Sequence, residues 1–146
     1  MSTQTAVKPS LTIKRRLNAS PAKVFAAWTD PQKMIRWMGP PNIICCEVEN
    51  DLRVGGRYHI KMVVPGDEHN VGGVYREIVP DTKVVFTWAW ISTPERESLV
   101  TVTIKPDGDG SLMTLQHEQF FDEAARDRHN AGWTAIMDRF AQFVEA

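Results

Sequence analysis

Tryptophans and histidines are the residues in this sequence whose types and spacing could build a binding or reactive site. The chain of 146 residues holds five tryptophans and four histidines. An indole ring offers a large apolar area with one N–H donor, and an imidazole can act as acid, base, metal ligand or hydrogen-bond partner near neutral pH. These residue types are therefore typical of an apolar binding pocket with a few polar groups, or of an acid–base site.

The histidines lack the spacing of metal-binding motifs. His59, His69, His117 and His129 form no H-x-H or H-x-x-x-H pair, and the segment "HEQFF" that begins at His117 lacks the second histidine of H-E-x-x-H. We therefore expect no metal site.

Motifs of nucleophilic and nucleotide chemistry are absent from the sequence. It contains no G-x-S-x-G, no G-x-G-x-x-G and no G-x-x-x-x-G-K-[ST]. We therefore assign no catalytic residue and no cofactor, and the sequence leaves open whether any reaction is catalysed.

Composition and charge narrow the range of partners. The formal net charge is −1, whereas a nucleic-acid surface normally carries a basic excess. No apolar run approaches the roughly 20 residues that span a membrane. The first ten residues, "MSTQTAVKPS", lack the apolar core of a signal peptide. We therefore expect a cytoplasmic protein, monomer or homodimer, that binds neither nucleic acid nor membrane.

Apolar periodicity and turn residues predict an antiparallel sheet with two short helices near its start. Residues 11–18 alternate as a half-buried strand does. Ser20 and Asp30 each precede a proline, and an N-cap followed by proline predicts two short consecutive helices that end at "GPP". About six strands follow, and their short connections favour antiparallel neighbours. These strands are predicted at 43–50, 57–64, 70–79, 83–91, 99–105 and 111–120.

A long amphipathic helix is predicted from about Asp122 to Val144. A helix of this length is roughly 30 Å long, which is enough to cross the sheet. Because one apolar sheet face needs a cover, we expect an α+β fold in which a curved antiparallel sheet of about six to seven strands wraps around this helix. At 100° per residue one arc of the helix carries His129, Trp133, Ile136, Met137, Phe140, Phe143 and Val144.

Gly132 lies inside this helix, directly before Trp133. Glycine in a helix interior costs about 1 kcal/mol relative to alanine. We interpret Gly132 as a small neighbour of the bulky ring, which either lets the helix approach the sheet or leaves a void beside it.

The inward-facing aromatic residues allow two interpretations. Strand alternation places Trp88 and Trp90 on one face, and Tyr58 and Met62 on the inner face of their strand, whereas the orientation of Tyr75 is ambiguous. Such residues either fill the core or line an apolar pocket in which two histidines are the polar anchors. The second interpretation predicts a ligand-binding set of Trp37, Tyr58, Met62, Tyr75, Trp88, Trp90, His117, His129, Trp133 and Met137.

The order of the elements and several segments resemble the START-like, or SRPBCC, helix-grip superfamily, whose fold is also described as Bet v-like. The branch that they resemble is that of homologues of the C-terminal domain of the heat-shock-protein ATPase activator. The resemblance implies a cavity between the sheet and the long helix, in a single domain at 10–146 that follows a flexible segment at 1–9. The matching segments are "ASPAKVFAAWTDPQKMIRWMGP" (19–40), "DLRVGGRYHIKM" (51–62), "GVYREIVPDTKVVFTWAW" (73–90), "LVTVTIKPDGDGSLMTLQHEQF" (99–120) and "RHNAGWTAIMDRF" (128–140).

Several functions are implied by this resemblance, because relatives include lipid and hormone binders, polyketide cyclases and aromatases, and co-chaperones. We favour binding of a small hydrophobic molecule in the cavity. One alternative is a co-chaperone-type interaction protein of the stress response that stimulates a heat-shock ATPase. The other is an enzyme of cyclase, aromatase or hydrolase type, with His117, His129 or Tyr58 as acid–base groups.

Overall fold

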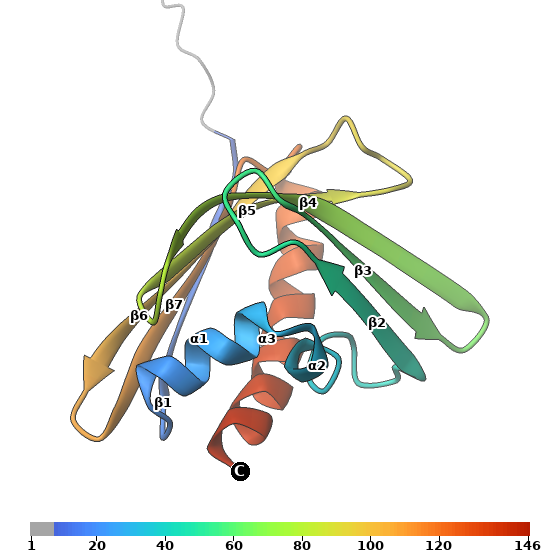
Figure 1. Cartoon of the computed structure of the whole chain (residues 1–146). Helices are drawn as coiled ribbons and strands as arrows, with labels where there is room; N and C mark the ends of the chain where they lie inside the picture. The colour runs from blue at the N-terminus through green and yellow to red at the C-terminus, as the bar shows by residue number, and fades with distance from the viewer. Residues whose placement is uncertain (1–7) are drawn as a thin grey trace, which may run out of the picture.

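The computed structural model describes residues 8–146, so most of the segment 1–9, for which flexibility is predicted, lies outside the described residues. In these residues one strand, two short helices, six further strands and a long helix follow one another in the predicted order (Figure 1). Their bounds are β1 Leu11–Leu17, α1 Pro21–Thr29, α2 Pro31–Met34, β2 Cys45–Asn50, β3 Arg57–Val64, β4 Asp67–Val79, β5 Lys83–Trp90, β6 Ser98–Asp107, β7 Gly110–Glu118 and α3 Glu123–Glu145.

The strands form one antiparallel sheet that curves around α3. Their order across the sheet is β1-β7-β6-β5-β4-β3-β2, so β1 lies at an edge beside β7. Figure 1 shows the sheet arched over α3, with α1 and α2 across its open side. The helix-grip α+β fold predicted from the sequence is confirmed.

The helices begin at the capping residues that the sequence indicates. The side chain of Ser20 accepts a hydrogen bond from the backbone N–H of Lys23 at 3.2 Å, and that of Asp30 accepts from Gln32 at 2.9 Å. Both caps satisfy backbone donors that have no partner inside the helix. Local sequence therefore sets where α1 and α2 start.

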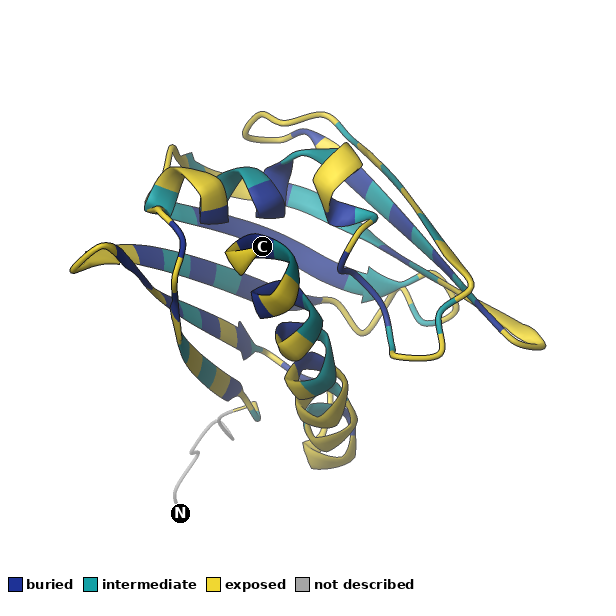
Figure 2. Ribbon diagram, turned by 90° about the horizontal axis from the view of Figure 1, so that it is seen from below, coloured by how far each residue is buried: buried dark blue, intermediate teal, exposed yellow. Residues whose placement is uncertain are grey.

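A buried aromatic cluster lies where α1 and the turn after α2 meet the C-terminal half of α3. The rings of Trp28 and Trp37 are 4.7 Å apart between centroids, and Phe140 of α3 lies 4.7 Å from Trp37. All three side chains are at most 1% exposed. Figure 2 shows that the buried residues of the sheet and helices face this interior.

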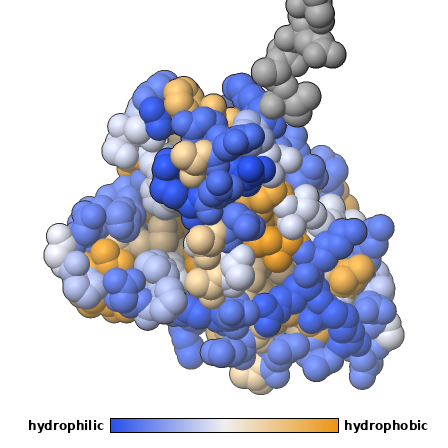
Figure 3. Space-filling view, turned by 180° about the vertical axis from the view of Figure 1, so that it is seen from behind, coloured by the Kyte–Doolittle hydropathy of each residue, from blue (hydrophilic) through white to orange (hydrophobic). Residues whose placement is uncertain are grey.

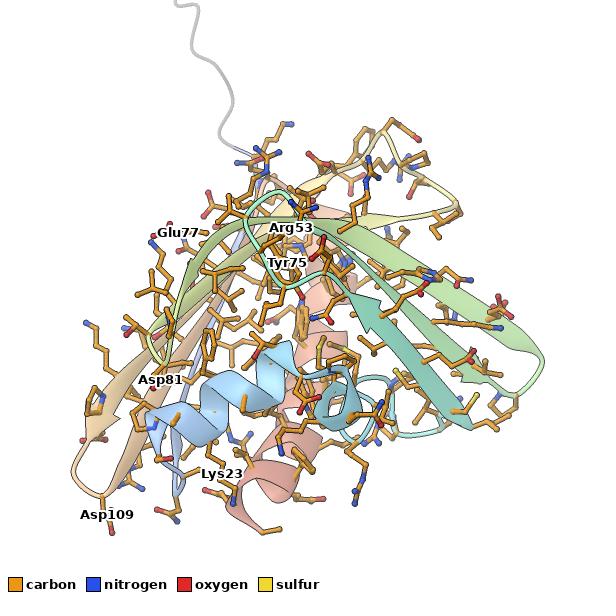
Figure 4. All side chains as sticks on the ribbon, in the orientation of Figure 1. Lys23, Arg53, Tyr75, Glu77, Asp81 and Asp109 are labelled. Atoms are coloured by element: carbon orange, nitrogen blue, oxygen red, sulfur yellow. The ribbon has the colours of Figure 1, made fainter. Side chains whose placement is uncertain are left out.

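The orientation of Tyr75, ambiguous in the sequence, is decided by a β-bulge in β4. The pairing of β4 with β5 shifts register between Tyr75 and Glu77. An extra residue in a bulge changes which side chains face inward. Tyr75 is 3% exposed and accepts a hydrogen bond from Asn50 Nδ2 at 3.0 Å, while Glu77 is exposed. In Figure 4 Tyr75 accordingly lies beneath the sheet and Glu77 outside it.

Strand β4 begins earlier than predicted. The sequence "PGDE" predicts a turn before residue 70, but β4 starts at Asp67, and Met62 of β3 pairs with His69. The turn is thus tighter than expected, and the β3–β4 arm is longer. This extension brings His69 and Asn70 to the site described next.

Candidate functional site

A cavity of about 950 Å³ lies between the sheet and the N-terminal half of α3. We call it the main cavity. The β3–β5 part of the sheet forms one wall, residues 128–136 of α3 form the other, and Pro40 and Pro41 complete the rim. Figure 3 shows hollows on the back of the molecule in which apolar residues are exposed between polar ones. The main cavity is therefore accessible from solvent and mostly apolar inside.

Small residues on α3 keep the main cavity wide. A Cβ added at Gly132 would meet no heavy atom of another element within 4 Å. Ala131 and Ala135 line the same wall, and neither reaches across the space. Of the two interpretations of Gly132, close approach of helix and sheet is therefore wrong, and the void is correct.

His129 is the polar centre of the main cavity. Its Nε2 receives the indole N–H of Trp90 at 3.0 Å and that of Trp88 at 3.3 Å, and its Nδ1 lies 2.8 Å from the backbone oxygen of Ala125. An indole N–H can only donate, so Nε2 is the unprotonated acceptor, and Nδ1–H donates to Ala125. The pKa of His129 is lowered mainly by burial, while the bond to Ala125 raises it and Arg128 lowers it further. The imidazole is neutral in this arrangement.

His117 lies behind the main cavity in a buried hydrogen-bond chain. Trp133 Nε1–H donates to its Nδ1 at 3.0 Å, so its Nε2–H donates to the hydroxyl of Ser98 at 2.7 Å. That hydroxyl in turn donates to the backbone oxygen of Trp88 at 3.0 Å. Burial, with a further contribution from His129, lowers the pKa of His117 to about 2. The chain locks Trp133 and Trp88, two walls of the main cavity, to each other.

The close contact of Ser98 with His117 is not a nucleophile paired with its base. Such a pair requires the imidazole to accept the hydroxyl proton. Here the direction is opposite, because Trp133 occupies the acceptor nitrogen and the serine proton goes to the backbone. Tyr58 is also committed, since its hydroxyl donates to the backbone oxygen of Thr87, and burial raises its pKa well above the usual value. His129 alone among the three acid–base candidates lines the main cavity.

The predicted ligand-binding set divides into two groups. Met62, Trp88, Trp90, His129 and Trp133 line the main cavity. The other five lie in the adjoining core instead. Ligand contact by any of the ten stays a prediction. The five core residues are Trp37, Tyr58, Tyr75, His117 and Met137.

Several residues around the main cavity were not singled out from the sequence. Some come from turns whose path the sequence does not predict, and others from the exposed side of α3. Ser98, which orients His117, gives no sequence signal beyond its place at the start of a strand. The additional lining residues are Pro40, Pro41, Glu68, His69, Asn70, Ile91, Ser92, Arg128, Ala131 and Ala135.

A second, smaller cavity of about 130 Å³ adjoins the first. We call it the side cavity. It shares Trp88, Trp90, Arg128 and His129 with the main cavity, and Arg96 and the start of α3 close its other side. Trp88, Trp90 and His129, which we call the indole–imidazole cluster, therefore line both the large main cavity and the small side cavity.

Within residues 8–146, no three His, Cys, Asp or Glu side chains are grouped so that they could hold a metal ion. Among the helices that the structure describes, none is both long and apolar enough to cross a membrane.

Comparisons with known proteins agree with this architecture. A family model described as "Activator of Hsp90 ATPase homolog 1-like protein" matches residues 18–145. Protein CV1439 from Chromobacterium violaceum is 27% identical and has a TM-score of 0.86, over 94% of this chain and 97% of its own. The AHSA1 protein from Silicibacter pomeroyi is 28% identical, with a TM-score of 0.79 over 92% and 96%. No curated protein sequence matches significantly.

A more distant neighbour shares the fold. CalU16 from Micromonospora echinospora is 24% identical in its crystal structure, with a TM-score of 0.70 over 92% of this chain and 75% of that one.

Proposed function

Because the chain belongs to the family of activator of Hsp90 ATPase homolog 1-like proteins, we propose that its single domain, residues 10–146, binds a small hydrophobic molecule in the main cavity. The observation that carries the proposal is a space of about 950 Å³ walled by three indole rings, those of Trp88, Trp90 and Trp133. Pockets for small molecules are typically about 300–1,000 Å³, mostly apolar, with a few placed polar groups. This cavity has that size and that composition.

Burial of apolar surface would supply the binding free energy. A ligand that buries about 300 Å² of apolar surface gains roughly 7 kcal/mol, from which the cost of immobilising it must be subtracted. The indoles are already held by hydrogen bonds to two histidines, so they lose little freedom on binding. A preformed site of this kind favours binding by lowering that cost.

The ten predicted residues take two roles in this proposal. Met62, Trp88, Trp90 and Trp133 contact the ligand through apolar surface, and His129 is the polar group within its reach. The other five lie in the core behind the walls of the main cavity and do not contact the ligand. Their part is to fix the walls, as His117 does by accepting the N–H of Trp133.

A ligand screen with a matched pair of variants tests the proposal. Apolar compounds that bind should raise Tm by mass action and quench tryptophan fluorescence, because three of the five tryptophans line the main cavity. Gly132→Phe should abolish both signals, since its ring would fill the open space beside the helix. Thr134→Phe, on the exposed side of α3, is the control and should leave binding intact.

Two results would contradict the proposal. One is a panel of apolar compounds that leaves both Tm and fluorescence unchanged. The other is binding that survives Gly132→Phe, which would locate the ligand elsewhere.

A co-chaperone-type interaction is the second candidate, and the family description is the observation that favours it. In this case the partner is a heat-shock ATPase, and the protein should accelerate its ATP hydrolysis. Steady-state ATPase measurements with and without the protein test this directly. Acceleration that persists in Gly132→Phe would assign the effect to a surface outside the main cavity.

A further inference from the structure

The side cavity has the charge of an anion site. Arg96, from the loop between β5 and β6, and Arg128, from α3, both line it. Within the described part of the chain, no aspartate or glutamate is among its lining residues. Two guanidinium groups without a carboxylate make this corner positive, although the net charge of the chain is −1.

Neither arginine is neutralised by a neighbouring acid. Within residues 8–146, no carboxylate oxygen lies within ion-pair distance of Arg96 or Arg128, and Arg96 instead stacks over the ring of Phe121 at 4.0 Å. Two neighbouring acids pair with other arginines, and Glu95, directly before Arg96, is exposed and lines neither cavity. Asp127 pairs with Arg126 at 2.7 Å, and Glu97 lies 3.9 Å from Arg76.

The indole–imidazole cluster provides a further donor at this place. A neutral imidazole nitrogen has one in-plane lone pair, yet His129 Nε2 receives N–H groups from both Trp88 and Trp90. One of these bonds can therefore be replaced by a bond to another acceptor at little cost. Trp90 is the more exposed of the two indoles, so its N–H is the one that an incoming oxygen can reach.

Glu68, an acidic residue of the main-cavity lining, already has partners. It lies 3.6 Å from Lys61 and accepts a hydrogen bond from Asn70 Nδ2 at 2.9 Å. Among the described residues, Arg96 and Arg128 have no such charged partner, so the side cavity is the place that attracts an anionic group.

We propose that the ligand is an amphiphilic carboxylate, whose apolar body fills the main cavity and whose carboxylate lies in the side cavity against Arg96, Arg128 and the N–H of Trp90. This inference rests on the proposed function. The sizes agree, because 130 Å³ corresponds to about four water molecules at ~30 Å³ each, which is room for a carboxylate. Both guanidinium groups are exposed, so the carboxylate keeps part of its hydration and avoids the cost of full burial.

Dodecanoate and methyl dodecanoate test the inference as a matched pair. Their apolar chains are equal, and only the acid carries a charge at pH 7.5. Titration calorimetry below the micellar concentration should give about tenfold tighter binding of dodecanoate, since charge-assisted hydrogen bonds are stronger than neutral ones. Raising KCl from 50 to 500 mM should reduce the difference, because salt screens exposed charges.

Substitutions assign the effect to the side cavity. Arg96→Gln and Arg128→Gln should each weaken dodecanoate binding by about fivefold, and the double variant by more than tenfold. Arg96 does not line the main cavity, so Arg96→Gln should leave binding of the ester unchanged. Arg126→Gln is the control, since Arg126 lies on the same helix but pairs with Asp127 and lines neither cavity. Trp90→Phe should likewise weaken the acid more than the ester, because it removes the donor and retains an aromatic ring.

The outcomes separate this inference from the proposed function. Equal affinities for acid and ester, with both lost in Gly132→Phe, would overturn the carboxylate assignment and leave the apolar site in place. Binding of neither compound would contradict both for this ligand class. A preference for the acid that survives the double arginine substitution would also overturn the inference, because the charge recognition would then lie outside the side cavity.

Discussion

The two halves of α3 face the same sheet and behave differently. From Trp133 onward the helix buries Trp133, Met137, Phe140, Ala141 and Val144, whereas residues 123–132 bury only Ala125. We call these the closed half and the open half. The closed half therefore packs the core of the domain, whereas the open half, together with Trp133, Ala135 and Ile136 at the start of the closed half, lines the main cavity.

The closed half is packed because three elements bring rings to one place. Trp28 of α1 and Trp37, which follows α2, meet Phe140 at centroid distances of 5.5 and 4.7 Å. The indole donors of both tryptophans are satisfied, by Met113 Sδ at 3.2 Å and by the backbone oxygen of Ala27 at 3.0 Å. Aromatic pairs of this kind contribute beyond the area that they bury.

The open half has no such covering element. Its aromatic partners, Trp88 and Trp90, come from the end of β5, and both donate hydrogen bonds to His129. Hydrogen bonds fix their orientation while the space beside Gly132 remains. The packed core and the cavity lining therefore lie at different positions along the 23 residues of α3.

The largest effect that tests this division is loss of a ring from the closed half. Phe140→Ala should lower the free energy of unfolding by about 3–5 kcal/mol, because a fully buried ring is removed and its neighbours close the gap only in part. Ile136→Ala, in the part of the closed half that lines the main cavity, should cost only about 1 kcal/mol, since that side chain is partly exposed. Urea denaturation measures both values. Equal decreases in the free energy of unfolding would show that the cavity border is packed as tightly as the core around Phe140.

A smaller effect concerns His117, where the two halves meet. Its pKa of about 2 in the folded state lies below the usual value of about 6.5, so the folded state favours the neutral ring. The contribution of neutral His117 to the free energy of unfolding is therefore fully present above about pH 6.5. As the pH falls below this value, the contribution decreases by up to about 1.4 kcal/mol per pH unit.

His117→Gln should remove this part of the pH dependence, because glutamine does not titrate. The measurement is the free energy of unfolding of both proteins between pH 7 and pH 4.5. The difference between them separates the contribution of His117 from that of the carboxyl groups. Parallel curves for the two proteins would show that the pKa of His117 is the same in the folded and unfolded states.

The smallest effect comes from two opposite substitutions, glycine to alanine in the open half and alanine to glycine in the closed half. Gly132→Ala should stabilise the protein by about 0.5–1 kcal/mol, since a Cβ meets no atom there and alanine favours the helix. Ala141→Gly, in the closed half, should destabilise it by about 1 kcal/mol or more, because a buried methyl group is lost as well. Thermal unfolding at one pH compares the two. A destabilising Gly132→Ala would mean that the open half is more tightly packed than the structure indicates.

Much of the fold could be predicted because its signals are local. Ser20 and Asp30 mark helix starts within three residues, and strand alternation shows which side chains share a face. Tyr75 marks the limit of this reasoning, since a bulge in β4 changes the alternation and depends on the pairing with β5. The candidate site could be predicted only as a set of inward aromatic residues.

The order of the elements, the curved sheet with its long helix, and a glycine where a helix would prefer another residue can all be inferred from the amino-acid sequence. Which aromatic residues fill the core and which enclose the cavity depends on how distant elements pack against each other. Phe86 and Trp90 share one face of β5, yet Phe86 packs 6.4 Å from Trp28 while Trp90 lines the main cavity. The reason is that a cavity is a volume left over between elements distant in the chain, and no short stretch of sequence carries that difference.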